Sequence, residues 1–180
     1  MSTIKEGISI LIPTWNNLPY LRGCVDSLKR FSDFDNEIIL HINDGSDGTL
    51  EYAKAEGLKH THSETNIGLC RGINACAAEA REPFVVYFND DMYALPGWDS
   101  GIERFMALYD VPDLFWACPM LIEGFGKNPD FIAGDQYNFG RTPDAYDEKR
   151  IVERLDELKS VGVARSGVSW APCLMSTEAW

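Results

Sequence analysis

The stretch that decides the fold is FVVYFNDD, residues 84–91. Its first five residues are bulky and apolar without alternation, which is typical of a strand buried on both faces of a parallel sheet. The polar triplet Asn89–Asp91 follows at the carboxyl end of that strand, the edge where open α/β sheets bind ligands. Two adjacent carboxylates repel each other unless a cation or hydrogen-bond donors share them. The stretch therefore predicts an α/β fold with a divalent metal site that faces a phosphate.

Strand and helix patterns alternate through the first half of the chain. Strands separated by helices imply βαβ units and a mostly parallel sheet. The Asp44-Gly45 pair alone would favour a hairpin, but the segment after it is helical, so we expect a strand-to-helix turn. The predicted strands are 8–13, 37–42, 58–63, 84–88 and 114–118, and the predicted helices are 17–31, 49–56, 67–80 and 96–109.

The second half has a different character. Residues 119–142 are rich in glycine and aromatic residues and predict a long irregular segment. A charged helix is expected at 143–159 and a last strand at 167–175. Residues 176–180 read as the opening of another helix, where a domain should not end. We therefore expect a single domain over 1–180 that is truncated at its C-terminus.

Charge and composition argue against several classes of protein. The chain carries 16 basic and 28 acidic residues, a formal charge of -12, and a nucleic-acid binder needs a basic footprint. No apolar stretch approaches the ~20 residues of a membrane span, and the N-terminus lacks the apolar core of a signal peptide. Five cysteines without a CxxC pair indicate reduced, mostly buried thiols and a cytoplasmic location.

Three side chains near predicted strand or helix ends are candidates for ligand contacts, each with a simpler alternative. Asp44 could accept a hydrogen bond from a nucleobase or ribose, or only shape a turn. Arg71 lies in the first turn of a helix, where the macrodipole disfavours a cation, so it predicts a diphosphate partner, or else a salt bridge to Glu64 or an ordinary surface arginine, which by itself is the commoner case. Trp15 could stack on a base, although packing at the sheet edge is the commoner role of an isolated Trp.

The triplet Asn89–Asp91 could instead cap a helix, but the next helix is expected only near Pro96. Hard oxygen ligands at one site suit Mg²⁺ or Mn²⁺, which keep water ligands and bridge phosphates. His60 and His62 share one strand face without a cysteine or acid at ligand spacing, which argues against a zinc site.

The order of the motifs closely resembles that of family 2 glycosyltransferases. The resemblance covers residues 7–100, and 170–175 resembles the strand before the family's acceptor-site helix. It implies a GT-A fold, a Rossmann-like three-layer α/β/α architecture with a mostly parallel central sheet, in which 1–100 form the nucleotide-sugar half and 101–180 begin the acceptor half. The motifs are ISILIPTWNN at 8–17, NDGSDGT at 43–49, NIGLCRGIN at 66–74, FNDD at 88–91 and PGW at 96–98.

The resemblance also implies roles for individual residues. Asp44 would hold the base, usually uracil, and Arg71 would lie near the phosphates. Asp91 would be the ligand of Mn²⁺ or Mg²⁺ in a D-x-D-type element. This chain departs from the family by carrying Asn89 at the first acid position, which removes one charge that Asp90 could partly replace. The implied donor-binding residues are Pro13, Trp15, Asn17, Asp44, Arg71, Asn89 and Asp90.

The function implied by the resemblance is inverting, metal-dependent transfer of a sugar, most often from a UDP-sugar, to a glycan or lipid-linked acceptor. We expect this to take place in the cytoplasm, with peripheral membrane association possible but no nucleic-acid partner. No residue matches the family's catalytic base, which is expected beyond Trp180. The composition of the irregular segment suggests that the aromatic residues Phe125, Phe131, Tyr137 and Phe139 stack on sugars, and a mobile lid would fit the same residues.

Two alternatives stay open. A nucleotide-sugar binding module, or an inactive fragment that lacks the catalytic base, would carry the same motifs. A nucleotidyltransferase is disfavoured because the loop after the first strand, PTWNN at 13–17, has neither the glycines nor the lysine of that class.

Overall fold

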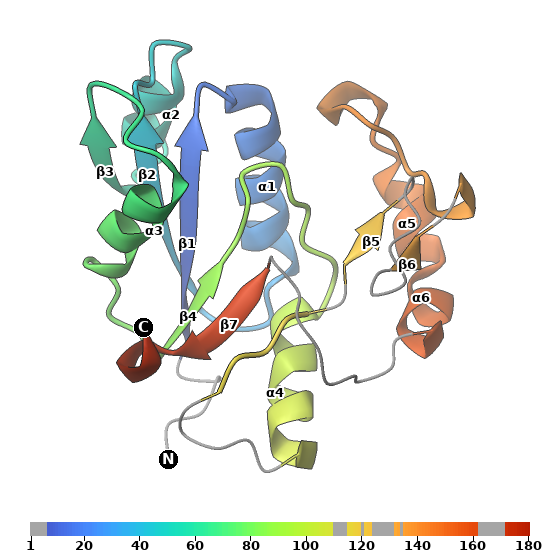
Figure 1. The fold of residues 1–180 in the computed structure, drawn as a ribbon. Coiled ribbons are helices and arrows are strands. Elements are labelled where there is room, and N and C mark those ends of the chain that lie inside the picture. The colour runs from blue at the N-terminus through green and yellow to red at the C-terminus, as the bar shows by residue number, and fades with distance from the viewer. Residues whose placement is uncertain (1–6, 110–114, 120, 124–131, 134, 162–171) are drawn as a thin grey trace.

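Five strands form the central sheet, in the order β3-β2-β1-β4-β7 (Figure 1). The computed structural model describes residues 7–109, 115–119, 121–123, 132–133, 135–161 and 172–180. The first four strands run parallel to one another, and β7 is antiparallel to β4. The strands are β1 (Ile8–Trp15), β2 (Glu37–Asn43), β3 (Lys59–Ser63), β4 (Phe84–Tyr87) and β7 (Cys173–Ser176).

Helices cover both faces of this sheet, so the predicted three-layer α/β/α architecture is confirmed. Side chains of β1 alternate between the layers: Ile10 and Ile12 pack with α1, α2 and α4, whereas Leu11 packs with α3. Because both faces of the sheet are covered, the central strand β4 is apolar and buried at every position. The helices are α1 (Leu18–Phe31), α2 (Thr49–Ala55), α3 (Leu69–Ala77) and α4 (Trp98–Tyr109).

The turn after β2 leads into α2 and not into a returning strand, which confirms that Asp44-Gly45 does not form a hairpin. All five cysteines are free thiols. Cys24, Cys76 and Cys173 are buried in the two cores, where burial raises the pKa of each thiol.

The second half departs further from the prediction. The segment expected to be irregular contains two short parallel strands, and the helix expected at 143–159 is broken at Arg154. Of the strand expected at 114–118, the described part forms a single bridge from Ala117 to Leu174. The elements are β5 (Ile122–Glu123), β6 (Ile132–Ala133), η2 (Asp135–Tyr137), η3 (Pro143–Ala145), α5 (Glu148–Glu153), α6 (Leu155–Val161) and η4 (Thr177–Ala179).

Two further expectations concern this half. The last strand is described from Cys173 to Ser176, and 167–171 of its predicted range lie outside the described residues. Phe139 is buried in a small cluster with Ile151 and Leu158, so its ring is not free to stack on a sugar. Phe125 and Phe131 lie outside the described residues.

Candidate functional site

The site lies at the edge of the sheet where the parallel strands end. Figure 1 shows the arrowheads of β1, β2 and β3 directed to the same edge. The register places Trp15 of β1 beside Asn43 of β2, so the residues that follow these strands are neighbours in space. The triplet Asn89–Asp91 follows β4 on the other side of β1. The fold therefore brings three predicted motifs to one edge.

Asp44 is held by a network at the end of β2. Its carboxylate Oδ2 accepts a hydrogen bond from Nδ2 of Asn16 at 2.9 Å, and its Oδ1 accepts one from the backbone N–H of Ser46 at 3.2 Å. The bond from Asn16 is the largest cause that lowers the pKa of Asp44. The residue is only partly buried. It is therefore an ionised acceptor at the surface of the site.

Asn16 was not singled out from the sequence. Besides binding the carboxylate, its Oδ1 accepts a hydrogen bond from the backbone N–H of Gly45 at 3.1 Å. Asn16 and Asp44 both have left-handed backbones, with φ of 47° and 64°. Asn and Asp tolerate this region better than other side chains, so the two adjacent asparagines after β1 were a weak sequence signal.

The two adjacent acids after β4 have opposite environments. Oδ2 of Asp90 accepts from Oγ1 of Thr14 at 2.6 Å, and its Oδ1 accepts from Nδ2 of Asn17 at 3.0 Å. Burial, with a smaller contribution from the charge of Asp91, raises the pKa of Asp90. Asp91 is exposed, and no hydrogen bond or ion pair of its carboxylate occurs within the described part of the chain. Protein donors therefore satisfy Asp90 and leave Asp91 for a ligand.

Asn89 is also occupied, because its Oδ1 accepts a hydrogen bond from the Tyr87 hydroxyl. Burial raises the pKa of Tyr87 to about 12, so this hydroxyl keeps its proton. Asn89 thus stabilises the end of β4. An asparagine at this position, where the family carries an acid, also avoids a further negative charge beside Asp90 and Asp91.

Three of the implied donor-binding residues, Trp15, Pro13 and Asn17, occupy different places at the end of β1. Trp15 is 59% exposed at the end of β1, so the alternative that it packs at the sheet edge is wrong. Pro13 is buried against α3, where its Cβ lies 3.2 Å from the position that a Cβ on Gly72 would take. Asn17 precedes α1 and binds Asp90. Of the three, only Trp15 presents an open face.

Arg71 lies exposed in the first turn of α3. Within the described ranges the Arg71 guanidinium has neither an ion pair nor a hydrogen bond. The alternative of a salt bridge to Glu64 therefore does not hold, whereas that of a surface arginine agrees with its exposure. A cation at a helix N-terminus is disfavoured by the macrodipole. A bound anion would remove this conflict.

The donor atoms at this edge fit a metal that is shared with a substrate. Among the residues that the structure describes, no group of three or more His, Cys, Asp or Glu side chains could hold a metal ion by itself. Mg²⁺ and Mn²⁺ sites often use only one or two carboxylates together with phosphate oxygens and water. Asp91 can supply such a carboxylate. His60 and His62 instead bind the backbone carbonyls of Leu58 and Asp44.

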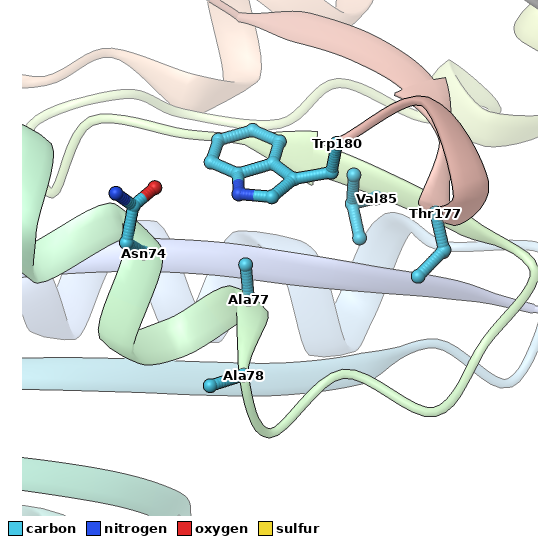
Figure 2. A pocket seen from close by; sticks show the side chains of 6 residues that line it. All are labelled: Asn74, Ala77, Ala78, Val85, Thr177 and Trp180. Carbon is cyan, nitrogen blue, oxygen red and sulfur yellow. The ribbon is translucent and has the colours of Figure 1, made fainter.

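A separate hollow of about 390 Å³ lies between α3 and the end of the described chain (Figure 2). Figure 2 shows the Trp180 indole extending over Ala77 towards Asn74. None of the site residues described above lines this hollow. Its lining residues are Asn74, Ala77, Ala78, Val85, Thr177 and Trp180.

Solved structures with the same fold include proteins in complex with nucleotide-sugars. The structure of S. aureus TarS 1-349 is similar with a TM-score of 0.59 and 21% sequence identity, over 68% of this chain and 37% of that one. The same protein has been solved in complex with UDP-GlcNAc and with UDP. The mannosyltransferase PcManGT from Pyrobaculum calidifontis, in complex with GDP-Man and Mn²⁺, has a TM-score of 0.54 and 18% identity, over 64% of this chain and 35% of that one.

Sequence comparison agrees with the fold. The uncharacterized glycosyltransferase EpsJ of Bacillus subtilis (strain 168) is 33% identical over 91 residues, which are 48% of this chain and 26% of EpsJ. The chain thus spans about a quarter of the length of that relative. No described helix is long and apolar enough to cross a membrane. The model of the family "Glycosyl transferase family 2" matches residues 9–154, so this chain, with its GT-A fold, belongs to glycosyltransferase family 2.

Proposed function

We propose that the chain binds the donor of an inverting, metal-dependent glycosyltransferase that moves a sugar from a UDP-sugar to a glycan or lipid-linked acceptor. The observation that carries this proposal is the arrangement of Asp44, Arg71 and Asp91. Asp44 can accept a further hydrogen bond from a base, Arg71 can pair with a phosphate, and Asp91 can bind a cation. Asp44 follows β2, Arg71 lies in the first turn of α3, and Asp91 lies in the loop after β4, so all three lie at one edge of the sheet. The complexes of TarS with UDP-GlcNAc and of PcManGT with GDP-Man and Mn²⁺ support it.

The proposed roles follow from the environment of each side chain. Asp44 accepts an N–H of the base, because its carboxylate is ionised and retains free lone pairs. Trp15 offers its exposed ring to the base or ribose. Arg71 pairs with the diphosphate, whose charge grows as the bond to the sugar breaks. Asp91 would hold Mn²⁺ or Mg²⁺, which when bound adds positive charge beside the leaving diphosphate.

Asp90, Thr14 and Asn17 keep this arrangement in place. By tying the loop after β4 to the end of β1 and the start of α1, the two hydrogen bonds of Asp90 direct Asp91 away from the protein. We assign the base that deprotonates the acceptor hydroxyl to the acceptor half, since Asp44 and Asp91 are committed to the donor and both oxygens of Asp90 accept hydrogen bonds from Thr14 and Asn17.

Isothermal titration tests the donor site. UDP, with GDP for comparison, is titrated with and without Mn²⁺ into the wild type, Asp91→Ala and Asp26→Ala. Asp26 is exposed on α1, so its variant removes the same charge away from the site. We expect binding of UDP with Mn²⁺, weakened by at least about 10-fold in Asp91→Ala and unchanged in Asp26→Ala.

Two outcomes would contradict the proposal. A folded wild type that binds neither nucleotide would refute the donor site. Equal affinity of the wild type and Asp91→Ala for UDP in the presence of Mn²⁺ would refute the role of Asp91 as the metal ligand.

A further inference from the structure

We infer that Asn16 is a positioning residue for base recognition, whose amide orients the Asp44 carboxylate towards the nucleobase. The inference rests on the proposed function, because it takes Asp44 as the group that meets the base. Asn16 itself is not required to touch the nucleotide.

The geometry of the Asn16 amide carries the inference. Asn16 and Asp44 follow neighbouring strands whose last paired residues are Trp15 and Asn43. Nδ2 of Asn16 donates to Oδ2 of Asp44, and Oδ1 of Asn16 accepts from the N–H of Gly45. The amide thus uses its donor on the carboxylate and its acceptor on the adjacent backbone, which restricts rotation of the Asp44 side chain relative to the turn.

The backbone of Asp44 is anchored on its other side by β3. Its N–H donates to the carbonyl of Ser63 at 2.8 Å, and its carbonyl binds Nε2 of His62 at 2.9 Å. With both backbone groups bonded, the remaining freedom of Asp44 is the rotation of its side chain. Asn16 and the Ser46 N–H together limit that rotation.

The restricted rotation matters because it fixes the direction of the hydrogen-bond sites that remain free on the Asp44 carboxylate. An ionised carboxylate has about four lone-pair sites, and the bonds from Asn16 and Ser46 occupy one on each oxygen. The remaining sites accept hydrogen bonds only. They favour a base with a ring N–H at the centre of its pairing edge, as in uracil, and disfavour cytosine, whose ring nitrogen at the same position is also an acceptor.

The backbone strain supports this role. Left-handed conformations of residues other than glycine persist where the surroundings impose them, and they cluster at ligand sites. Here two such residues, Asn16 and Asp44, face each other across a strand pair with φ of 47° and 64°. In a turn with no further role, glycine could occupy either position. Gly45 and Gly48 adopt positive φ in the same way nearby.

A double-mutant cycle tests the inference. The variants are Asn16→Gly, Asp44→Gly and the two combined, because glycine accepts both left-handed conformations and each change then removes only a side chain. Dissociation constants for UDP and CDP are measured by titration with Mn²⁺ present. We expect the wild type to prefer UDP, Asn16→Gly to reduce the UDP-over-CDP preference by about 3- to 30-fold, and Asp44→Gly to abolish it. In the Asp44→Gly background, Asn16→Gly should change the preference by less than about 2-fold.

A second variant covers the case in which Asn16→Gly does not fold. Asn16→Asp keeps a side chain that tolerates the left-handed backbone and an acceptor for the Gly45 N–H. It also places a second carboxylate where the amide donor was, so we expect a loss of the UDP preference at least as large.

The outcomes separate the inference from the proposed function. If Asn16→Gly weakens UDP and CDP equally, or changes the preference as much without Asp44 as with it, the inference is overturned while the donor site stands. A wild type that binds UDP no better than CDP would refute the base contact of Asp44, and with it both the proposed recognition and the inference.

Discussion

Replacing Asp99 by alanine should destabilise the whole domain, because this carboxylate is fully buried and accepts hydrogen bonds from two segments. Asp99 lies in the first turn of α4, and its exposed fraction is 0%. It accepts from the backbone N–H groups of Asp33 and Phe34 at 3.0 and 3.1 Å, and from Nδ2 of Asn36 at 2.9 Å. The N–H of Ser100 donates at 2.9 Å. Asp99 thereby ties the far end of the loop that begins with Asn89–Asp91 to the segment after α1.

The magnitude follows from the donors that would lose their acceptor. An unsatisfied buried donor costs about 1–3 kcal/mol, and removing one side of a buried charged network about 3–5 kcal/mol. Water can reach part of the exposed loop around Asp33, so the lower end applies, and we expect a loss of about 3 kcal/mol. For a domain of this length that corresponds to a decrease in Tm of roughly 6–12 °C.

Urea unfolding followed by circular dichroism, together with calorimetry, would measure this loss. Asp35→Ala is the matched control, because Asp35 is an exposed acid in the same loop. Its variant should change the free energy of unfolding by less than about 0.5 kcal/mol. If Asp99→Ala loses less than about 1 kcal/mol, the hydrogen bonds of Asp99 do not stabilise the junction as we reason.

Two further predictions concern the site loop and the second half. Burial raises the pKa of Asp90 above its ordinary value of 3.8, so the stability that this carboxyl contributes is lost as pH rises from that value through its folded-state pKa. Asp90→Asn keeps an acceptor for Asn17 and does not ionise, so its free energy of unfolding relative to the wild type should increase over that pH range in urea titrations; a constant difference would refute this linkage. Gly140 has φ of 114°, and a Cβ there would lie 2.2 Å from the carbonyl oxygen of Ala145. Gly140→Ala should therefore lower the hydrogen-exchange protection of α5 and α6, whereas Gly101→Ala, where a Cβ meets only Arg104 Nη2 at 3.7 Å, should not; equal protection in both variants would contradict the steric argument.

The first half of the fold could be predicted because its signals are local. A strand covered on both faces is largely apolar, so β4 is visible in the sequence as an unbroken apolar run, and β1 as an apolar run interrupted by Ser9. The second half could not be predicted equally well. The helix break at Arg154 and the burial of Phe139 depend on contacts such as the Arg154 guanidinium over the Tyr137 and Phe139 rings, which involve residues from separate elements.

The sequence by itself determined that Asp44 and Asn89–Asp91 follow strands of a parallel sheet, and therefore that they share one edge. It did not determine which of two adjacent acids is free, or how Asp44 is oriented. Those properties depend on Thr14, Asn16 and Asn17. The hydrogen bonds to Asp90 span 76 and 73 residues of sequence, and that between Asn16 and Asp44 spans 28. Hydrogen-bond partners at such separation become neighbours only when the strands pair, so only the tertiary structure decided that the Asp90 carboxylate is occupied by protein donors and that of Asp91 is available.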